Sequence, residues 1–493
     1  MENKTQNGAP KFKSVAELRA QYESEASSAK ERIKSLFDEG TFVEIGTFAH
    51  SAAAELSGNE GELEGVICGY GAVDGRLVFA FAQDYSRMKG ALGAMHAKKI
   101  CSLYELATKN GAPVIGIFDS AGAFVLEGVE ALAGYGKVMR RVADASGVIP
   151  QIALIAGPCG GAMAAVAEMF DIVLATKSAS LYVNPPFIVN NLDKSGSAGS
   201  PETASAAGLV SAVLDDDASA LAYVRRLLSY IPQNSADGTV YASTNDEINR
   251  LTPDVAAIIS NDGYAMTDVI TAISDDSAFF ELYAGYAPEL VCGFVTLNGM
   301  VVGVAANQPS VNGGKLTPAA AEKAAKFISF CDCFAVPLLT LVDTEGYEVS
   351  AAAEKADYSM ALARLAAAYS SSDTAKVTVV LGRAYGAAYT LMGSKSIGAD
   401  IAFAADCAKI SAMPTASAVA FAWGDKVDDN AKRSELEAEW DAVMASPLAA
   451  AKAGEIDDII SLDELRQRTA AAFEMLSAKN TLKLKKRHAN LPL

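Results

Sequence analysis

Short apolar runs bounded by glycine, proline and charged residues recur along the chain, and their lengths predict an α/β protein. Residues 65–84 are expected to form two strands joined at residues 73–76, where an Asp-Gly pair supplies the positive φ of a tight hairpin turn. Residues 113–118 and 150–156 have the length and composition of buried parallel strands. The pattern therefore predicts a hairpin followed by parallel strands.

Longer stretches with mixed polar and apolar positions separate these strands. Residues 15–39 and 88–110 are predicted to be helices, with a short strand at residues 41–45 between them. Residues 119–122 are expected to turn away from the strand that precedes them. Residues 157–161, Gly-Pro-Cys-Gly-Gly, are predicted to be a glycine-rich turn into a helix that ends near Phe170.

The second half of the chain repeats this series, so the sequence predicts a duplicated unit. Four landmark pairs are 224 residues apart and a fifth pair is 225 apart: Gly75 and Gly299, Pro113 and Pro337, Asp119 and Asp343, Gly122 and Gly346, and Gly157 and Gly382. The polar stretch 233–254 is the expected joint. We predict a disordered tail at residues 1–14, a first domain at 15–245 and a second at 246–493.

Each half also carries a turn of small residues between a predicted strand and a helix. These turns are Gly160-Gly161-Ala162 and Gly386-Ala387-Ala388. Backbone amides at a helix start lack an intrahelical acceptor, and small side chains let a ligand approach them. Such amides can form an oxyanion hole, although close packing of a helix on a strand also demands small residues.

Composition excludes several classes of function. The formal net charge of -18 argues against binding of nucleic acid, whose phosphates need a basic surface. Three histidines and seven cysteines without a C-x-x-C pair give little basis for a metal site, and we expect no metal in this chain. No apolar run reaches the roughly 18 to 20 residues of a membrane span, and no signal peptide is evident, so we expect a cytoplasmic protein.

Motifs for nucleotide and hydrolase chemistry are missing from the sequence. Residues 313–317 resemble a phosphate loop, but Pro309 stands where its first glycine belongs and Leu316 where its hydroxyl belongs. The chain has no G-x-S-x-G elbow and no H-E-x-x-H helix. Two backbone anion holes with few acid-base side chains suit a reaction in which the substrate or a cofactor supplies the base.

Several segments resemble the carboxyltransferase (β) subunit family of biotin-dependent acyl-CoA carboxylases and sodium-translocating acyl-CoA decarboxylases. The segments that carry the resemblance are residues 81–84, 90–100, 127–128, 157–159, 307–309, 330–332, 384–386 and the terminal 486–493. The resemblance implies a tandem duplication of a crotonase (ClpP/crotonase-like) ββα-superhelix domain. It also implies a homo-hexamer built as a trimer of dimers, with each active site between the first half of one subunit and the second half of another.

The resemblance further implies the substrates and partners. The carboxyl group would pass between carboxybiotin, carried on a separate biotin carboxyl carrier protein, and a short acyl-CoA of the propionyl, acetyl or methylmalonyl type. The other partner would be a biotin carboxylase subunit or a membrane decarboxylase subunit, through which the protein could associate with a membrane. The biotin enolate itself would remove the α-proton of the thioester.

Site residues follow from the same resemblance. The amides of Gly161 and Ala162 are predicted to hold the enolate oxygen of the acyl-CoA, and those of Ala387 and Ala388 the ureido oxygen of biotin. The residues predicted to bind substrate and cofactor around them are Gly160, Gly122, Ala123, Gly346, Tyr385, Gly386 and Thr390.

The chain departs from the family pattern at three places. Phe124 replaces an arginine, residues 345–350 lack two prolines and a glycine of the family loop, and Thr390 stands where an acid is frequent. Three alternatives stay open beside the carboxylase subunit, and the altered residues motivate the silent one. They are a decarboxylase subunit of a sodium pump, a catalytically silent assembly subunit, and a biotin-independent crotonase-type hydratase or isomerase using Glu127 and Glu345.

Overall fold

The computed structural model describes residues 14–50, 63–194, 196–427 and 430–480. Residues 1–13 of the predicted tail lie outside this described part of the chain. The terminal signature at 486–493 lies outside it as well.

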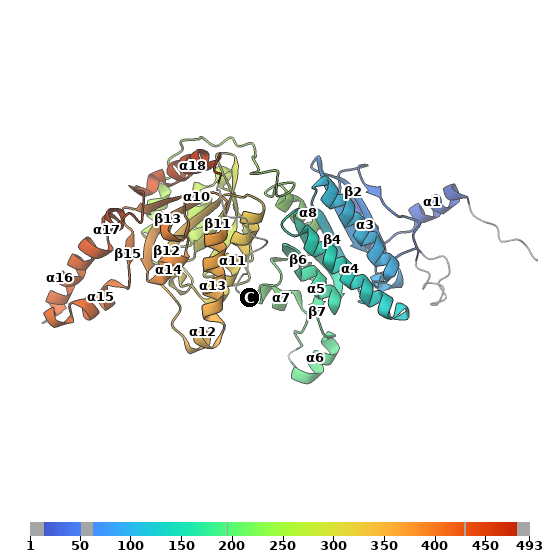
Figure 1. The fold of residues 1–493 in the computed structure, drawn as a ribbon, viewed down its shortest axis with the longest axis horizontal. Helices are drawn as coiled ribbons and strands as arrows, with labels where there is room; N and C mark the ends of the chain where they lie inside the picture. The colour runs from blue at the N-terminus through green and yellow to red at the C-terminus, as the bar shows by residue number, and fades with distance from the viewer. Residues whose placement is uncertain (1–13, 51–62, 195, 428–429, 481–493) are drawn as a thin grey trace, which may run out of the picture.

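Within the described residues, the strands form two eight-stranded sheets (Figure 1). The first has the order β1-β2-β3-β4-β5-β6-β8, with β7 paired to β5, and the second has the order β16-β14-β13-β12-β11-β10-β9, with β15 paired to β13. The strands of the first sheet are β1 Val43–Glu44, β2 Val66–Val73, β3 Arg76–Gln83, β4 Val114–Ser120, β5 Gln151–Gly160, β6 Ile172–Thr176, β7 Ser180–Tyr182 and β8 Ala212–Leu214. Those of the second are β9 Phe280–Leu282, β10 Leu290–Leu297, β11 Met300–Asn307, β12 Leu338–Thr344, β13 Lys376–Tyr385, β14 Ile401–Ala405, β15 Lys409–Ser411 and β16 Asp458–Ile460.

The predicted α/β class and the duplication are confirmed at the level of strand register. The antiparallel hairpin β2–β3 closes on Val73 paired with Arg76, and the hairpin β10–β11 closes on Leu297 paired with Met300, 224 residues later. The predicted Asp-Gly turn has positive φ at both residues, as does the Asn-Gly turn of the second hairpin. From β3 and β11 onward the ladders are parallel.

Helices cover both faces of each sheet. The helices of the first half are α1 Val15–Ser24, α2 Ser28–Leu36, α3 Ala94–Asn110, α4 Val129–Ala145, α5 Ala162–Glu168, α6 Pro186–Asp193, α7 Pro201–Ala206 and α8 Asp217–Leu228. Those of the second are α9 Asp254–Ile259, α10 Met266–Ile273, α11 Pro318–Cys333, α12 Ala351–Lys355, α13 Tyr358–Ser371, α14 Ala387–Leu391, α15 Thr415–Ala422, α16 Asn430–Trp440, α17 Pro447–Lys452 and α18 Leu465–Leu476. In the first half, α3 and α4 pack on one face and α2 and α8 on the other. In the second half, α11 and α13 pack on one face and α9, α10 and α18 on the other.

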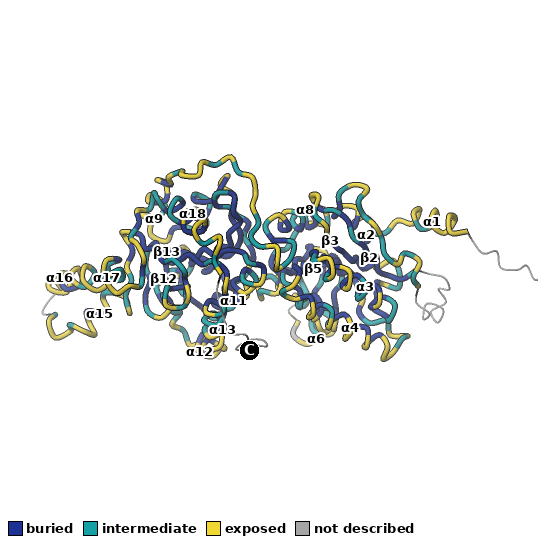
Figure 2. Tube along the Cα trace, turned by 45° about the horizontal axis from the view of Figure 1, so that its top comes forward, coloured by how far each residue is buried: buried dark blue, intermediate teal, exposed yellow. Residues whose placement is uncertain are grey.

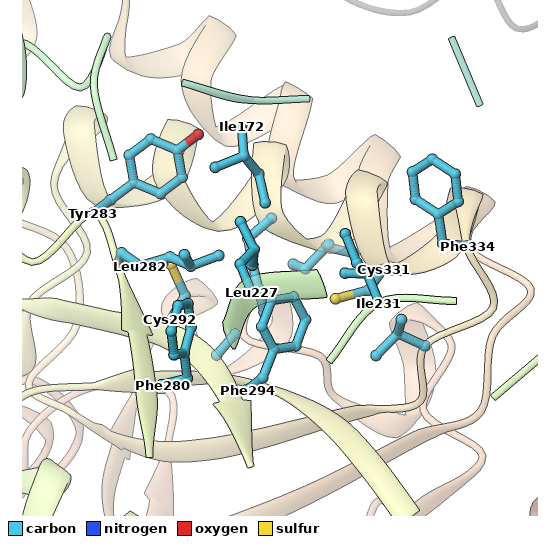
Figure 3. Close-up of a cluster of buried hydrophobic side chains, with 14 of the residues drawn as sticks. Ile172, Leu227, Ile231, Phe280, Leu282, Tyr283, Cys292, Phe294, Cys331 and Phe334 are labelled. Carbon is cyan, nitrogen blue, oxygen red and sulfur yellow. Dashed lines mark hydrogen bonds between the residues drawn. The ribbon is translucent and has the colours of Figure 1, made fainter. Parts of the chain in front are cut away.

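One hydrophobic core joins the two halves. Leu227 and Ile231 of the first half lie among Phe280, Phe294 and Cys331 of the second, and all five side chains are buried (Figure 3). Removal of this apolar surface from water stabilises the contact by roughly 25 cal/mol per Å² buried. The two sheets are therefore held by a shared interior. Figure 2 shows buried chain at the centre of each half.

The connection between the halves runs through the predicted polar stretch. Tyr241 forms a bridge with Met300 of β11, and the flanking Val240 and Ala242 exchange hydrogen bonds of 2.9 and 2.7 Å with Val301 and Gly299. By residue 240 the chain has thus reached the second sheet. The domain boundary at 245/246 stays a prediction.

Two predicted helices are each interrupted. The stretch 15–39 is divided into α1 and α2, because Ser27 adopts an extended conformation and its side chain accepts the Lys30 amide as an N-cap. The stretch 88–110 begins with a short 3-10 turn, η2 Met88–Gly90, in which Lys89 has a φ of 54°, and α3 begins only after Gly93. Both predictions of a continuous helix were wrong, because the Ser27 cap starts a new helix in the first stretch and positive φ angles at residues 88–90 interrupt the second.

All seven cysteines are free thiols. None of the helices in the described part of the chain is both long enough and apolar enough to cross a membrane.

A partly desolvated carboxyl group, Glu168, lies at the end of α5. Burial raises its pKa to about 7, against the opposing charge of Lys326 from the second half. One oxygen of Glu168 has no hydrogen-bond partner among the described residues. Its ionised form is therefore disfavoured in the folded protein.

We predict that Glu168→Gln raises the thermal midpoint at pH 8 and leaves it nearly unchanged at pH 4. A folded-state pKa above the unfolded value of 4.5 means that the native protein binds more protons between these values, so stability falls as pH rises from 4.5 to about 7. The neutral variant escapes this loss. Melting curves across this pH range test it, with exposed Glu130→Gln as the control; an equal shift at both pH values would contradict the prediction.

Candidate active site

In each half, a long parallel strand ends at a turn of small residues. The strand β5 ends at Gly160 and leads through Gly161, with a φ of 62°, into α5. In the second half β13 ends at Tyr385 and leads through Gly386, with a φ of 65°, into α14. The predicted loop at 157–161 is therefore corrected: residues 157–160 belong to β5, because they extend the strand beside β7.

The glycine of each turn uses its own amide to build the turn. Gly161 N–H donates to the carbonyl of Tyr182 at 2.9 Å, and Gly386 N–H donates to that of Ser411 at 2.9 Å. Because the Gly161 hydrogen is already engaged, the backbone geometry does not support its predicted role as a donor to the enolate. The residue instead provides the positive φ that the turn requires.

The residues after these glycines have matching environments. Ala162 and Ala387 are exposed, whereas Met163 and Ala388 are buried. All four stand in the first turn of a helix, where amides have no intrahelical acceptor. An anionic oxygen can thus approach the backbone at Ala162 and Ala387 without displacing a large side chain.

A second amide without a hydrogen-bond acceptor among the described residues follows the neighbouring strand in each half. Leu92 exchanges hydrogen bonds with Gly122 and Phe124, a parallel bridge that leaves the Ala123 amide directed away from Leu92. Leu316 exchanges hydrogen bonds with Gly346 and Glu348 in the same way, which leaves the Tyr347 amide directed away from Leu316. Among the described residues none accepts a hydrogen bond from the amides of Ala123 or Tyr347.

The structure brings these loops to the turns. Ser120 pairs with Cys159 at the ends of β4 and β5, and Thr344 pairs with Ala384 at the ends of β12 and β13. Gly122, Ala123 and Gly346 were predicted as site residues, but Tyr347 was missed. The signal for it was present in the repeat, since 123 + 224 = 347.

A cavity of about 720 Å³ opens at the second turn. It is lined by Gly386, Ala387, Tyr389, Thr390, Ile410, Ser411, Ala412, Val443, Met444, Ala449, Ala450, Lys452, Ala453 and Glu455. Gly386, Ala387 and Thr390 among the predicted residues thus face it, while Tyr385 and Ala388 are buried and do not line it. Its lining is mostly small and apolar, and its charged residues are Lys452 and Glu455.

Acid-base side chains around the turns are already engaged. Glu127 accepts the Ala94 amide, and Glu345 pairs with Arg383 at 2.7 Å and Lys315 at 3.3 Å. The fully buried His96 contacts Glu64 and Gln83 inside the first half. Glu127, Glu345 and His96 therefore already have contacts within the chain.

Over the described ranges, no group of three or more His, Cys, Asp or Glu residues could hold a metal ion.

Comparison with known proteins places these features in a family. Residues 20–491 match the model of the carboxyl transferase domain. The chain is 37% identical to the methylmalonyl-CoA decarboxylase subunit alpha of Propionigenium modestum, covering 97% of this chain and 96% of that protein. It is 36% identical to the propionyl-CoA carboxylase carboxyltransferase subunit of Haloferax mediterranei, with 97% and 95% covered.

A solved structure also resembles the chain over its whole length. Transcarboxylase 12S, a hexamer described with methylmalonyl-coenzyme A and methylmalonic acid bound, superposes with a TM-score of 0.90 at 33% identity. The match covers 97% of this chain and 94% of that one.

Gly160→Ala should destabilise the protein by about 1–3 kcal/mol, the usual range for overpacking. A Cβ at Gly160 would lie 2.4 Å from the Tyr182 ring, so one of the two must shift. Chemical denaturation of Gly160→Ala, Tyr182→Ala and the double variant measures the free energy of unfolding. The double variant should lose less of this free energy than the two single variants lose together. Gly136→Ala, where a Cβ meets nothing within 4 Å, is the control; simple additivity would refute the proposed contact.

Proposed function

The chain belongs to the carboxyl transferase family, and from that premise we propose that it moves a carboxyl group between carboxybiotin on a separate carrier and a short acyl-CoA. It is a biotin-dependent carboxyltransferase of the propionyl-CoA carboxylase and methylmalonyl-CoA decarboxylase type, built on a duplicated crotonase-like fold. The observation that carries the proposal is the pair of equivalent turns with exposed helix-start residues, Ala162 and Ala387.

In the first half, the proposed ligand is the thioester of the acyl-CoA. The amides of Ala162 and Ala123 are the proposed donors to its carbonyl oxygen, beside Gly160 and Gly122. Fixed donors stabilise the negative charge that develops on this oxygen when the α-proton leaves, commonly by a few kcal/mol each. Gly161 shapes this turn.

In the second half, the proposed ligand is the biotin ring. Its ureido oxygen would accept hydrogen bonds from the amides of Ala387 and Tyr347, the counterparts of Ala162 and Ala123, with Gly346, Gly386 and Thr390 around it. Ala388, the other predicted donor, and Tyr385 are buried, so the proposal does not assign them a contact with biotin. The cavity at this turn supports the proposal, because its lining is mostly small and apolar and includes the turn residues Gly386 and Ala387. When bound, carboxybiotin supplies carbon dioxide and the base for the α-proton, which agrees with the engaged carboxylates nearby.

The proposed assembly is a homo-hexamer, or at least a dimer, whose sites are completed by a neighbouring subunit. Transcarboxylase 12S is described as a hexamer. Large apolar side chains are exposed on α6, on α15, and both before and at the start of α4, where assembly would cover them: Val125, Leu126, Val129, Phe187, Leu192 and Phe421. A cytoplasmic location belongs to the same proposal.

A second candidate is the reverse reaction, as the decarboxylase subunit of a sodium pump. The similarity to a methylmalonyl-CoA decarboxylase alpha subunit favours it. Labelled carboxyl transfer should be followed in both directions with a biotinylated carrier and a panel of acetyl-, propionyl- and methylmalonyl-CoA. Co-purification with a biotin carboxylase would support carboxylation, and co-purification with a membrane subunit would support decarboxylation.

The biotin-independent alternatives are less favoured. Glu127 and Glu345 lie in different halves and each is engaged by other groups. Hydration or isomerisation of an enoyl-CoA without biotin would favour the hydratase reading. Failure to bind any acyl-CoA would favour a silent subunit.

Ala162→Val and Ala387→Val should each lower carboxyl transfer by about 10²–10³-fold, the usual effect of losing an oxyanion donor. The branched side chain would keep the substrate oxygen away from the backbone at an exposed position. Transfer from carboxylated carrier to propionyl-CoA measures the loss. Ala165→Val, at an exposed position further along α5, is the control, and full activity in both test variants would remove the turns from the mechanism.

A further inference from the structure

In each sheet the central ladder breaks at one aspartate. Phe118 pairs with Ile155 and Ser120 with Cys159, so Asp119 alone opposes residues 156–158. In the second sheet Asp343 alone opposes residues 381–383, between the pairs of Val342 and Thr344. These are bulges in β5 and β13, and a bulge redirects the strand that carries it.

The aspartate carboxylates fill the two bulges. A Cβ at Gly157 would lie 2.1 Å from an oxygen of Asp119, and one at Gly382 would lie 2.4 Å from an oxygen of Asp343. Both aspartates are buried. The glycine at each bulge thus leaves room for the carboxylate, and in the second half the carboxylate also accepts the amide of Arg383.

In the first half, the cation for the carboxylate comes from a distant helix. Arg32 of α2 donates to Asp119 at 2.6 Å, to the Ala156 carbonyl at 3.0 Å and to Asp217 of α8 at 2.7 Å. Pro158 has no amide hydrogen to offer. Burial raises the pKa of the Asp119 carboxyl, and the bond and charge of Arg32 oppose this effect.

In the second half, the cation comes from the bulge itself. Arg383 stands at the position of Pro158, since 158 + 225 = 383. Its amide and its Nε donate to Asp343 at 3.0 and 2.9 Å, and its Nη1 donates to Glu345 at 2.7 Å. Lys315 also contacts Glu345, at 3.3 Å.

Each bulge stands directly before an amide turn. Residues 159 and 160 lead from the first bulge to Gly161, and residues 384 and 385 lead from the second to Gly386. The loop that contains Glu345 also meets this strand end, because a Cβ at Gly346 would lie 3.4 Å from the Tyr385 carbonyl. The direction of the strand end, and hence of the turn, depends on how the bulge is held.

We propose that Asp119 with Arg32, and Asp343 with Arg383, are positioning pairs, each of which sets the geometry of its own amide turn. The proposal rests on the function above, in which the first turn serves the acyl-CoA and the second serves biotin. Because the two arginines come from different elements, the two turns can be perturbed separately.

The test compares two reactions in the full-length protein. Transfer from carboxylated carrier to propionyl-CoA needs both turns, whereas release of labelled carbon dioxide from the carrier without acceptor needs only the second. Arg383→Gln should slow both reactions by about tenfold or more, since misplacing a catalytic group by about 1 Å can cost about 10²-fold. Arg32→Gln should slow transfer similarly and leave acceptor-free release within about twofold.

Further variants guard against loss of folding. Asp119→Asn and Asp343→Asn keep the volume of the side chain in the bulge. Asp119→Asn should slow transfer alone, as Arg32→Gln does, and Asp343→Asn should slow both reactions, as Arg383→Gln does. Arg383→Lys should restore part of the acceptor-free release lost in Arg383→Gln. Arg225→Gln removes a half-buried arginine that pairs with Asp38 at 2.8 Å and also with Asp74, and is the control.

Two outcomes would overturn the positioning pairs. One is slowing of acceptor-free release by Arg32→Gln that is as strong as the slowing by Arg383→Gln. The other is unchanged rates of transfer and of release in both variants. A wild-type protein that neither transfers nor releases carbon dioxide would instead contradict the proposed function, so the two failures are distinguishable.

Discussion

The structure depends on how it satisfies the backbone amides where its central strands end. Buried amides must find acceptors, and nearly all of them do so within the sheets and helices. At the ends of β5 and β13 the chain turns sharply, the glycine amide is bonded across to β7 or β15, and the next residue is left at the surface. A donor that is fixed in place and not bonded within the protein is what a developing negative charge requires.

Duplication explains why there are two such places and why they differ. The same frame of hairpin, parallel strands, bulge and turn recurs with a spacing of 224 or 225 residues. Within that frame, Pro158 and Ala121 of the first half correspond to Arg383 and Glu345 of the second. Two substrates that each carry charge on an oxygen can thus be served by one architecture with different surroundings.

The second half shows how a departure from the family pattern is compensated. The loop at 345–350 lacks the prolines of the family, which would have limited its conformations. In this chain Arg383 and Lys315 pair with Glu345, and the Tyr358 hydroxyl accepts the Glu348 amide at 3.0 Å. Side-chain contacts replace proline as the constraint on this loop.

The sequence by itself determined the α/β class, the duplication and the two small-residue turns, because strand length, Asp-Gly turns and residue spacing are local properties. It did not reveal that the Gly161 amide is engaged by Tyr182, that Tyr347 offers an amide, or that Arg32 reaches Asp119 across 87 residues. Those features depend on which strand ends lie side by side. Hydrogen-bond partners far apart along the chain are decided by tertiary packing, and no local pattern encodes them.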